Sequence, residues 1–130
     1  MDFDRWSKSG YYHYLPGVID YSKAPYESLK GSRDKGFIEV FLTDWSSPRR
    51  IDSTKADFID VPNDPHVIGW GRLELEGATD GYVRFDIPIE YSSSKTPSYI
   101  VVIMTPSGLG EHFTGSSHSV LYADEFRFNY

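Results

Sequence analysis

Apolar and polar residues alternate with a period of two along much of this 130-residue chain, a pattern typical of β-strands with one buried face. In residues 82–91 the odd-numbered positions from 83 to 91 are all apolar and are expected to face a core. Pro88 lies within this run and cannot donate a ladder hydrogen bond, so we expect a sheet edge there. In residues 36–43, Ile38, Val40 and Leu42 share one face and are expected to pack inward.

The last third of the chain predicts two more strands. Residues 99–104 form a continuous apolar run between Pro97 and a Pro-Ser-Gly turn, which favours a strand buried on both faces. Residues 120–128 alternate, and the more aromatic face, with Tyr122, Phe126 and Phe128, is expected to point inward. This assignment places Asp124 among apolar side chains.

A carboxylate in such a position needs partners, because burying an unpaired charge is costly. We expect Asp124 either to accept hydrogen bonds from backbone N–H groups of a neighbouring loop or to bind a structural cation. Ca²⁺, which takes oxygen ligands, is the candidate cation. The sequence places no second carboxylate opposite Asp124 for a catalytic role, and it predicts no other cofactor.

Strands are also expected at 11–15 and 66–75, with a doubtful edge strand between 51 and 61, and no window has the spacing of a long helix. The pattern predicts an all-β fold, an antiparallel β-sandwich that is jelly-roll-like. We expect a single domain over 1–130, with 1–9 as an N-terminal extension. A full jelly roll has eight strands, so an unpaired edge strand would be open to a second copy of the chain and could give a dimer.

Composition excludes several classes of function. The net charge is −6 and the basic residues are dispersed, so nucleic acid is not an expected partner. The absence of cysteine excludes disulfides, thiolate nucleophiles and zinc fingers. The four histidines are scattered, and neither a Gly-x-Ser-x-Gly elbow nor a phosphate-binding loop is present. The sequence contains no signal peptide or transmembrane run.

Four segments resemble, in the same order, one known family. They are Gly10-Tyr11-Tyr12-His13-Tyr14-Leu15-Pro16-Gly17, Val40-Phe41-Leu42-Thr43-Asp44-Trp45, Ile87-Pro88-Ile89-Glu90-Tyr91, and a C-terminal segment ending in Ser119-Val120-Leu121-Tyr122-Ala123-Asp124-Glu125-Phe126. The family is the "putative carbohydrate metabolism domain" of cell-surface proteins from Gram-negative gut bacteria. Its members typically end in Gly-Ser-x-Leu-Tyr-Val-Asp-Asp. Here Ala123 replaces the Val, Glu125 the second Asp, and His118 the usual Gly.

The resemblance implies a jelly-roll sandwich like those of many carbohydrate-binding modules, a glycan or polysaccharide partner, and a secreted or cell-surface location. Family members normally begin with a further N-terminal region and an export signal. We therefore expect this chain to be a fragment of a secreted protein.

Four aromatic residues are candidates for stacking on the C–H faces of sugar rings. Tyr21 and Tyr26 lie in a long loop, and Trp70 is flanked by two glycines. Trp45 follows a strand and fits a core position equally well. The leading hypothesis is a non-catalytic glycan-recognition module. The alternatives are a structural or adhesive surface domain that binds no sugar and, with less support, a glycoside hydrolase, which needs two carboxylates across a cleft.

Overall fold

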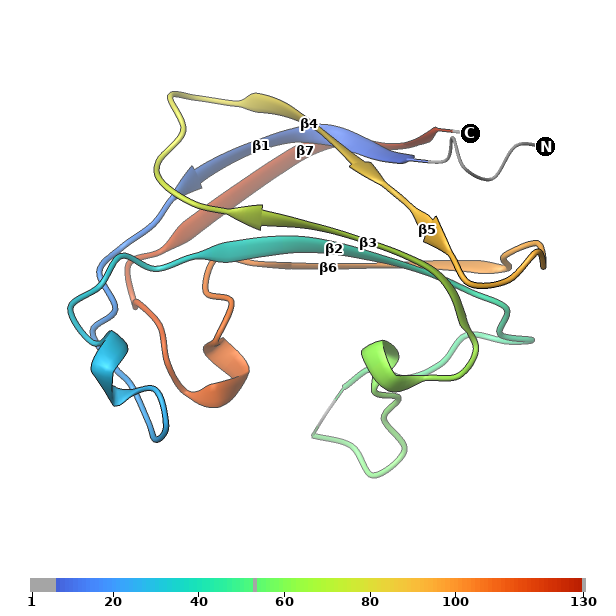
Figure 1. The fold of residues 1–130 in the computed structure, drawn as a ribbon, viewed down its shortest axis with the longest axis horizontal. Coiled ribbons are helices and arrows are strands. Elements are labelled where there is room, and N and C mark those ends of the chain that lie inside the picture. Colours follow the sequence, from blue (N-terminus) through green and yellow to red (C-terminus); the bar gives the residue numbers. More distant parts are fainter. Residues whose placement is uncertain (1–6, 53, 130) are drawn as a thin grey trace.

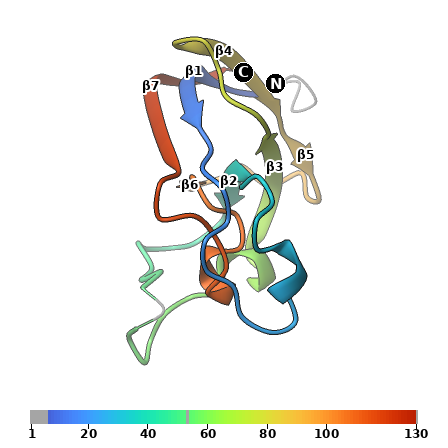
Figure 2. The same ribbon diagram turned by 90° about the vertical axis from the view of Figure 1, so that its left-hand side faces the viewer.

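The computed structural model describes residues 7–52 and 54–129, and within them it has seven strands and three short 3-10 helices. The strands form two antiparallel sheets that face each other (Figures 1 and 2). The three-stranded sheet has the order β4-β1-β7, and the four-stranded sheet has the order β5-β3-β2-β6. The strands are β1 (Ser7–Leu15), β2 (Gly36–Thr43), β3 (Val67–Leu75), β4 (Val83–Pro88), β5 (Glu90–Tyr91), β6 (Tyr99–Thr105) and β7 (Val120–Asn129). The predicted all-β antiparallel sandwich is confirmed.

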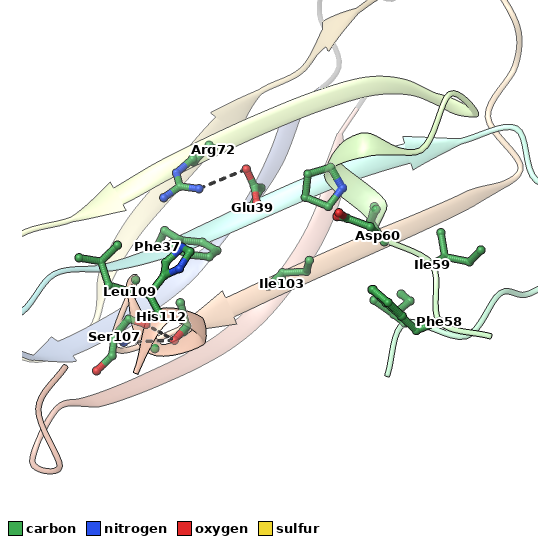
Figure 3. A pocket seen from close by; sticks show the side chains of 16 residues that line it. Phe37, Glu39, Phe58, Ile59, Asp60, Arg72, Ile103, Ser107, Leu109 and His112 are labelled. Atoms are coloured by element: carbon green, nitrogen blue, oxygen red, sulfur yellow. Dashed lines mark hydrogen bonds and ion pairs between the residues drawn. The ribbon is translucent and has the colours of Figure 1, made fainter. Parts of the chain in front are cut away.

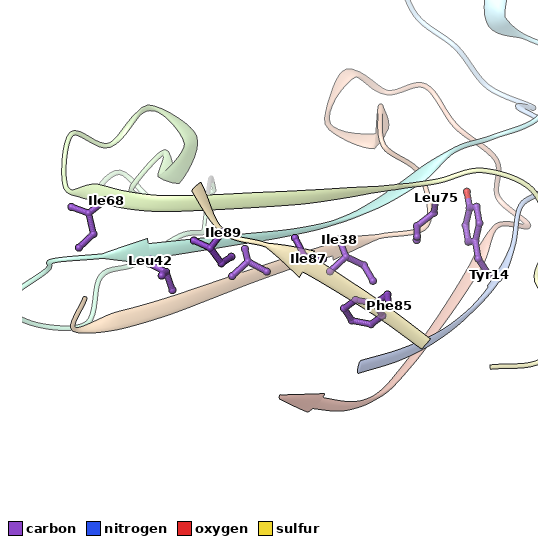
Figure 4. Close-up of a cluster of buried hydrophobic side chains, with 9 residues drawn as sticks. Tyr14, Ile38, Leu42, Ile68, Leu75, Phe85, Ile87 and Ile89 are labelled. Carbon is purple, nitrogen blue, oxygen red and sulfur yellow. The ribbon is translucent and has the colours of Figure 1, made fainter. Parts of the chain in front are cut away.

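The core lies between the two sheets, as the alternation predicts. The inward residues of β2 are Ile38, Val40 and Leu42, and all three are fully buried. They meet the buried odd-numbered residues of the 82–91 run and Tyr14 of β1 (Figure 4). Because these side chains are large and apolar, their burial is the main force that holds the sheets together.

The 82–91 run leaves one sheet and joins the other at Pro88. Its first part, β4, pairs with β1, and its second part, β5, pairs with β3. Both parts are the outermost strands of their sheets, so the edge position expected for Pro88 is confirmed. The crossing strand passes close to Gly71, where a Cβ atom would lie 2.5 Å from the Pro88 carbonyl oxygen.

The prediction that Asp124 lies on the inward face of β7 is wrong. Tyr122 and Asp124 are exposed, whereas Phe126 packs against the core. The cause is a β-bulge opposite Gly10, where Glu125 adopts a positive φ of 51° and shifts the alternation by one residue. Asp124 is therefore not a buried carboxylate, and its Oδ1 accepts a hydrogen bond of 2.8 Å from the Glu125 N–H. The side chain of Phe128 lies outside the described residues.

Three other expectations differ from the structure. β6 is an edge strand with exposed Ile100 and Met104, so it is not buried on both faces. No strand forms among the described residues between 51 and 61; a 3-10 helix, η3 (Val61–Asn63), follows this segment. β1 begins at Ser7, within the segment expected to precede the fold.

Candidate functional site: a groove on the outer face of the four-stranded sheet

A groove of about 770 Å³ lies on the face of the four-stranded sheet that points away from the core (Figure 3). Its floor is formed by side chains of three adjacent strands, and loops on either side form its walls. The strands contribute Phe37, Glu39, Arg72, Ile103 and Thr105. One wall contributes Ile51 and residues 58–62, and the other contributes residues 107–110 and His112. The surface is mixed, with apolar patches beside groups that can form hydrogen bonds.

Glu39 is the central polar group of the groove. It is only 7% exposed, and its Oε2 accepts hydrogen bonds from Trp70 Nε1 at 2.8 Å and from Arg72 Nη1 at 3.4 Å. Glu39 and Arg72 are opposite each other in the β2–β3 register. The buried carboxylate therefore fixes the positions of an indole and a guanidinium that come from the neighbouring strand.

Arg72 is held by two further contacts. Its Nε lies 2.6 Å from Glu74 Oε1, and its guanidinium carbon lies 4.0 Å from the centroid of the Phe37 ring. Burial lowers the pKa of Arg72, but the hydrogen bonds and ion pairs with Glu74 and Glu39 outweigh burial and raise this pKa above its ordinary value. The guanidinium is therefore a permanent cation in a fixed orientation.

The wall that contains residues 58–62 is anchored by Trp45. This side chain is 4% exposed, packs with Phe41 and Val61, and donates from Nε1 to Asp64 Oδ2 at 2.9 Å. Of the two roles considered for Trp45, the structure gives it the core one, so it is not available as a platform for sugar. Its function is to hold η3 and the preceding loop over the sheet.

The opposite wall contains the 3-10 helix η4 (Gly110–His112) and is anchored by Asp34, which is 3% exposed. Asp34 Oδ2 accepts hydrogen bonds from Ser107 Oγ, from the Ser116 N–H at 3.1 Å and from Ser119 Oγ at 2.7 Å. Its Oδ1 accepts a bond of 2.9 Å from the Lys35 N–H. One carboxylate thus joins the β1–β2 connection to the β6–β7 connection.

Tyr14 contacts the same wall from the core side. Its hydroxyl donates a hydrogen bond of 2.7 Å to the Pro106 carbonyl oxygen. Burial, followed by the negative charge of Asp34, raises the pKa of Tyr14 well above its ordinary value, so the phenol stays protonated as a donor. The wall is therefore linked to both the interior and the neighbouring loop.

A second hollow of about 430 Å³ adjoins the groove. The two share Arg72, Gly108 and Leu109, so they lie on either side of the same residues. Leu29 and residues 32–35 of the β1–β2 connection line the far side of the second hollow. An extended ligand in the groove can therefore continue past Leu109.

The predicted aromatic platform residues do not form one group. Trp70 is 40% exposed on the outer face and is bonded to the groove through Glu39. Tyr26 is half-buried, and its ring lies 5.3 Å from that of His112, a groove residue. Tyr21 is exposed but forms a β-bridge with Gly115 and does not line the groove. Trp70 therefore contacts a residue of the groove floor, and Tyr26 contacts a residue of one wall.

Asp124 was also a candidate ligand for a structural cation. Within 7–52 and 54–129, neither Asp124 nor any other residue belongs to a group of three or more His, Asp or Glu side chains that could hold a metal ion. Glu39, Arg72 and Asp34 are the residues that sequence reasoning missed. Glu39 is recognisable only as a charge on the aromatic face of a strand, and Asp34 lies in a loop expected to be on the surface.

The chain belongs to the family described as "putative carbohydrate metabolism domain". The family's sequence profile matches residues 6–129, which covers nearly the whole chain and confirms the resemblance. This domain is therefore carbohydrate-related. No curated protein matches the chain.

A crystal structure of a protein from Bacteroides thetaiotaomicron, described as a putative glycoside hydrolase, has a similar fold. The TM-score is 0.66 at 23% sequence identity, and the match covers 95% of this chain but 37% of that protein. The likeness supports the sandwich fold. In the part of the chain that the structure describes, no helix has the length and apolar character needed to cross a membrane.

Proposed function

We propose that this domain is a non-catalytic carbohydrate-binding module that holds a glycan in the outer-face groove. The observation that carries the proposal is the contact of Glu39 with both Trp70 and Arg72. It gives an exposed indole of fixed orientation beside a groove that has hydrogen-bonding groups on its floor. Membership of a carbohydrate-related family supports the same class of ligand.

The chemistry of the groove matches that of a sugar. Exposed rings of Trp70 and Phe58 can stack on the C–H faces of pyranose rings. Glu39 and Asp60 are acceptors for hydroxyl groups, and Arg72 Nη2, which has no hydrogen bond within the described part of the chain, is a donor. The walls are fixed by Trp45 and Asp34, so little ordering is required when a ligand binds.

Binding is favoured over hydrolysis because of how the carboxylates are used. Glu39 is engaged by Trp70 and Arg72, which suits an orienting group better than a proton donor. Asp60 accepts a hydrogen bond of 2.6 Å from Asn63 Nδ2. We therefore expect no reducing ends to be released from any glycan that binds.

The test begins with a glycan array and continues with calorimetry on a glycan that binds. Trp70→Ala should weaken binding at least about tenfold, equivalent to about 1.4 kcal/mol, because a stacking ring is lost. Tyr82→Ala is the matched control, since Tyr82 is 52% exposed near the opposite sheet, and it should leave the affinity unchanged. Unchanged binding by a folded Trp70→Ala variant contradicts the proposed groove. The absence of any binding favours the structural or adhesive alternative.

The secreted or cell-surface location stays a prediction that follows from the family. Immunodetection of the full-length protein on intact cells, with and without external protease, tests it. Protection of the protein from the protease in intact cells would contradict the expectation.

A further inference from the structure

The groove's charges indicate the class of glycan. Its lining contains two carboxyl side chains, Glu39 and Asp60, and one guanidinium, Arg72. Arg72 is already engaged by two carboxylates, Glu39 at 3.4 Å and Glu74 at 2.6 Å. The lining therefore presents an excess of negative charge to a ligand, although it contains an arginine.

Two basic residues at the margins are also paired with acidic ones. Arg50 lies 3.4 Å from Asp57, and these two residues are the chain neighbours of the lining residues Ile51 and Phe58. Lys35, at the second hollow, lies 3.2 Å from Glu76. These pairs are exposed and weak individually, but together they lower the positive potential around the groove. Arg33 in the second hollow contacts the Pro16 carbonyl oxygen rather than an acidic residue, so the charge argument applies to the groove and not to that hollow.

An anionic sugar would meet two costs in this groove. Glu39 and Glu74 already partly neutralise Arg72, so a carboxylate or sulfate bound at its Nη2 would gain little attraction, and it would be repelled by the nearby Glu39 and Asp60 carboxylates. Neutral hydroxyl groups meet neither cost, because they donate to carboxylates and accept from the guanidinium. The same groups that exclude an anion are therefore good partners for a neutral sugar.

We propose that the groove binds a neutral oligosaccharide and discriminates against glycans that carry carboxylate or sulfate groups. The proposal rests on the proposed function and adds the substrate class. The groove of about 770 Å³ provides space for more than one sugar unit, which favours a chain over a single sugar.

Native affinity electrophoresis tests the charge selectivity directly. The neutral polymers are xyloglucan, galactomannan, arabinoxylan and dextran, and the acidic polymers are polygalacturonate and chondroitin sulfate. The wild-type domain should be retarded by at least one neutral polymer and at least about tenfold less by either acidic one. Retardation by the neutral polymer should change less than about twofold between about 0.05 and 0.5 M NaCl, since it involves no net ion pairing.

A charge-reversal pair of variants adds a second measurement. Asp60→Lys places a cation at the groove and should increase retardation by acidic polymers several-fold. Asp86→Lys makes the same change on the opposite sheet, where Asp86 is exposed, and should not. No response to Asp60→Lys would overturn the charge argument.

The outcomes separate the two proposals. Retardation by acidic polymers alone, or more strongly than by neutral ones, overturns the neutral-glycan inference but leaves a carbohydrate-binding module. Retardation by no polymer, together with no binding on the glycan array, overturns both.

Discussion

Replacing Asp34 tests whether one buried carboxylate holds the groove wall. Asp34→Ala removes the acceptor of four hydrogen bonds, from Lys35, Ser107, Ser116 and Ser119. At about 1 kcal/mol net for each bond, the free energy of unfolding should fall by about 4 kcal/mol. A domain of this size has a total stability of about 5–15 kcal/mol, so the variant should be close to the limit of folding.

Asp34→Asn should cost less, for a geometric reason. Three of the four donors converge on Oδ2, and the amide oxygen can replace that atom. The amide NH₂ then occupies the position of Oδ1 and faces the Lys35 N–H, so one bond is lost and the others are weakened. We expect a loss of about 2 kcal/mol.

Urea unfolding followed by tryptophan fluorescence measures both variants. The midpoint should fall without a change in m, since the same surface is exposed on unfolding. The matched control is Asp86→Asn, which removes an exposed ion pair with Arg84 at 3.4 Å and should change stability by less than about 1 kcal/mol. If Asp34→Ala also costs less than about 1 kcal/mol, Asp34 does not hold the wall.

Three further expectations concern other parts of the fold. Hydrogen bonds from Lys95 and His66 hold the pKa of Asp44 below its ordinary value. The contribution of Asp44 to the free energy of unfolding is therefore fully present above about pH 4, and it is lost as the pH falls through the lower pKa of the folded state. The stability difference between wild type and Asp44→Asn in urea should therefore close on acidification, and a pH-independent difference contradicts this. Gly71→Ala should lower the free energy of unfolding by about 3 kcal/mol in a thermal melt, because the new Cβ atom would lie 2.5 Å from the Pro88 carbonyl oxygen. A loss under about 1 kcal/mol would argue against a fixed position of the crossing strand. The edge strand β6 contains no charged residue, so we expect it to pair with a second copy of the chain. Sedimentation should detect a dimer at high concentration, and Met104→Lys should abolish it. A wild-type monomer at every concentration refutes edge pairing.

The fold was largely predictable because alternation is a local property. Ile38, Val40 and Leu42 face the core as their spacing predicts, and Pro88 marks an edge because it lacks an N–H. The errors occur where contacts between distant parts of the chain determine the direction of a side chain or the position of a strand in its sheet. A bulge at Glu125 reverses the alternation of β7, and an apolar run does not reveal whether its strand is central or at an edge.

The candidate site was harder to predict because its contacts join distant residues. Glu39 and Arg72 are 33 residues apart, and they meet only through the register of β2 with β3. Asp34 and Ser119 are 85 residues apart, and each lies in a polar loop whose sequence indicates only a surface position. Trp70 was identifiable because its flanking glycines indicate a close backbone approach on one face and leave the indole on the other.

The two outer faces of the sandwich show that aromatic residues alone do not make a site. The three-stranded sheet also exposes a row of rings, in which His13 lies 5.9 Å from Tyr82 and 5.7 Å from Tyr122. However, the three long connections of the chain, 16–35, 44–66 and 106–119, fold beside the four-stranded sheet (Figure 1). Among the described residues these connections give that face its walls, which are held by buried polar groups together with the core packing of Trp45. Asp34 and Trp45 hold the two walls of the groove, so variants that loosen either wall should weaken glycan binding even where the binding residues themselves are unchanged.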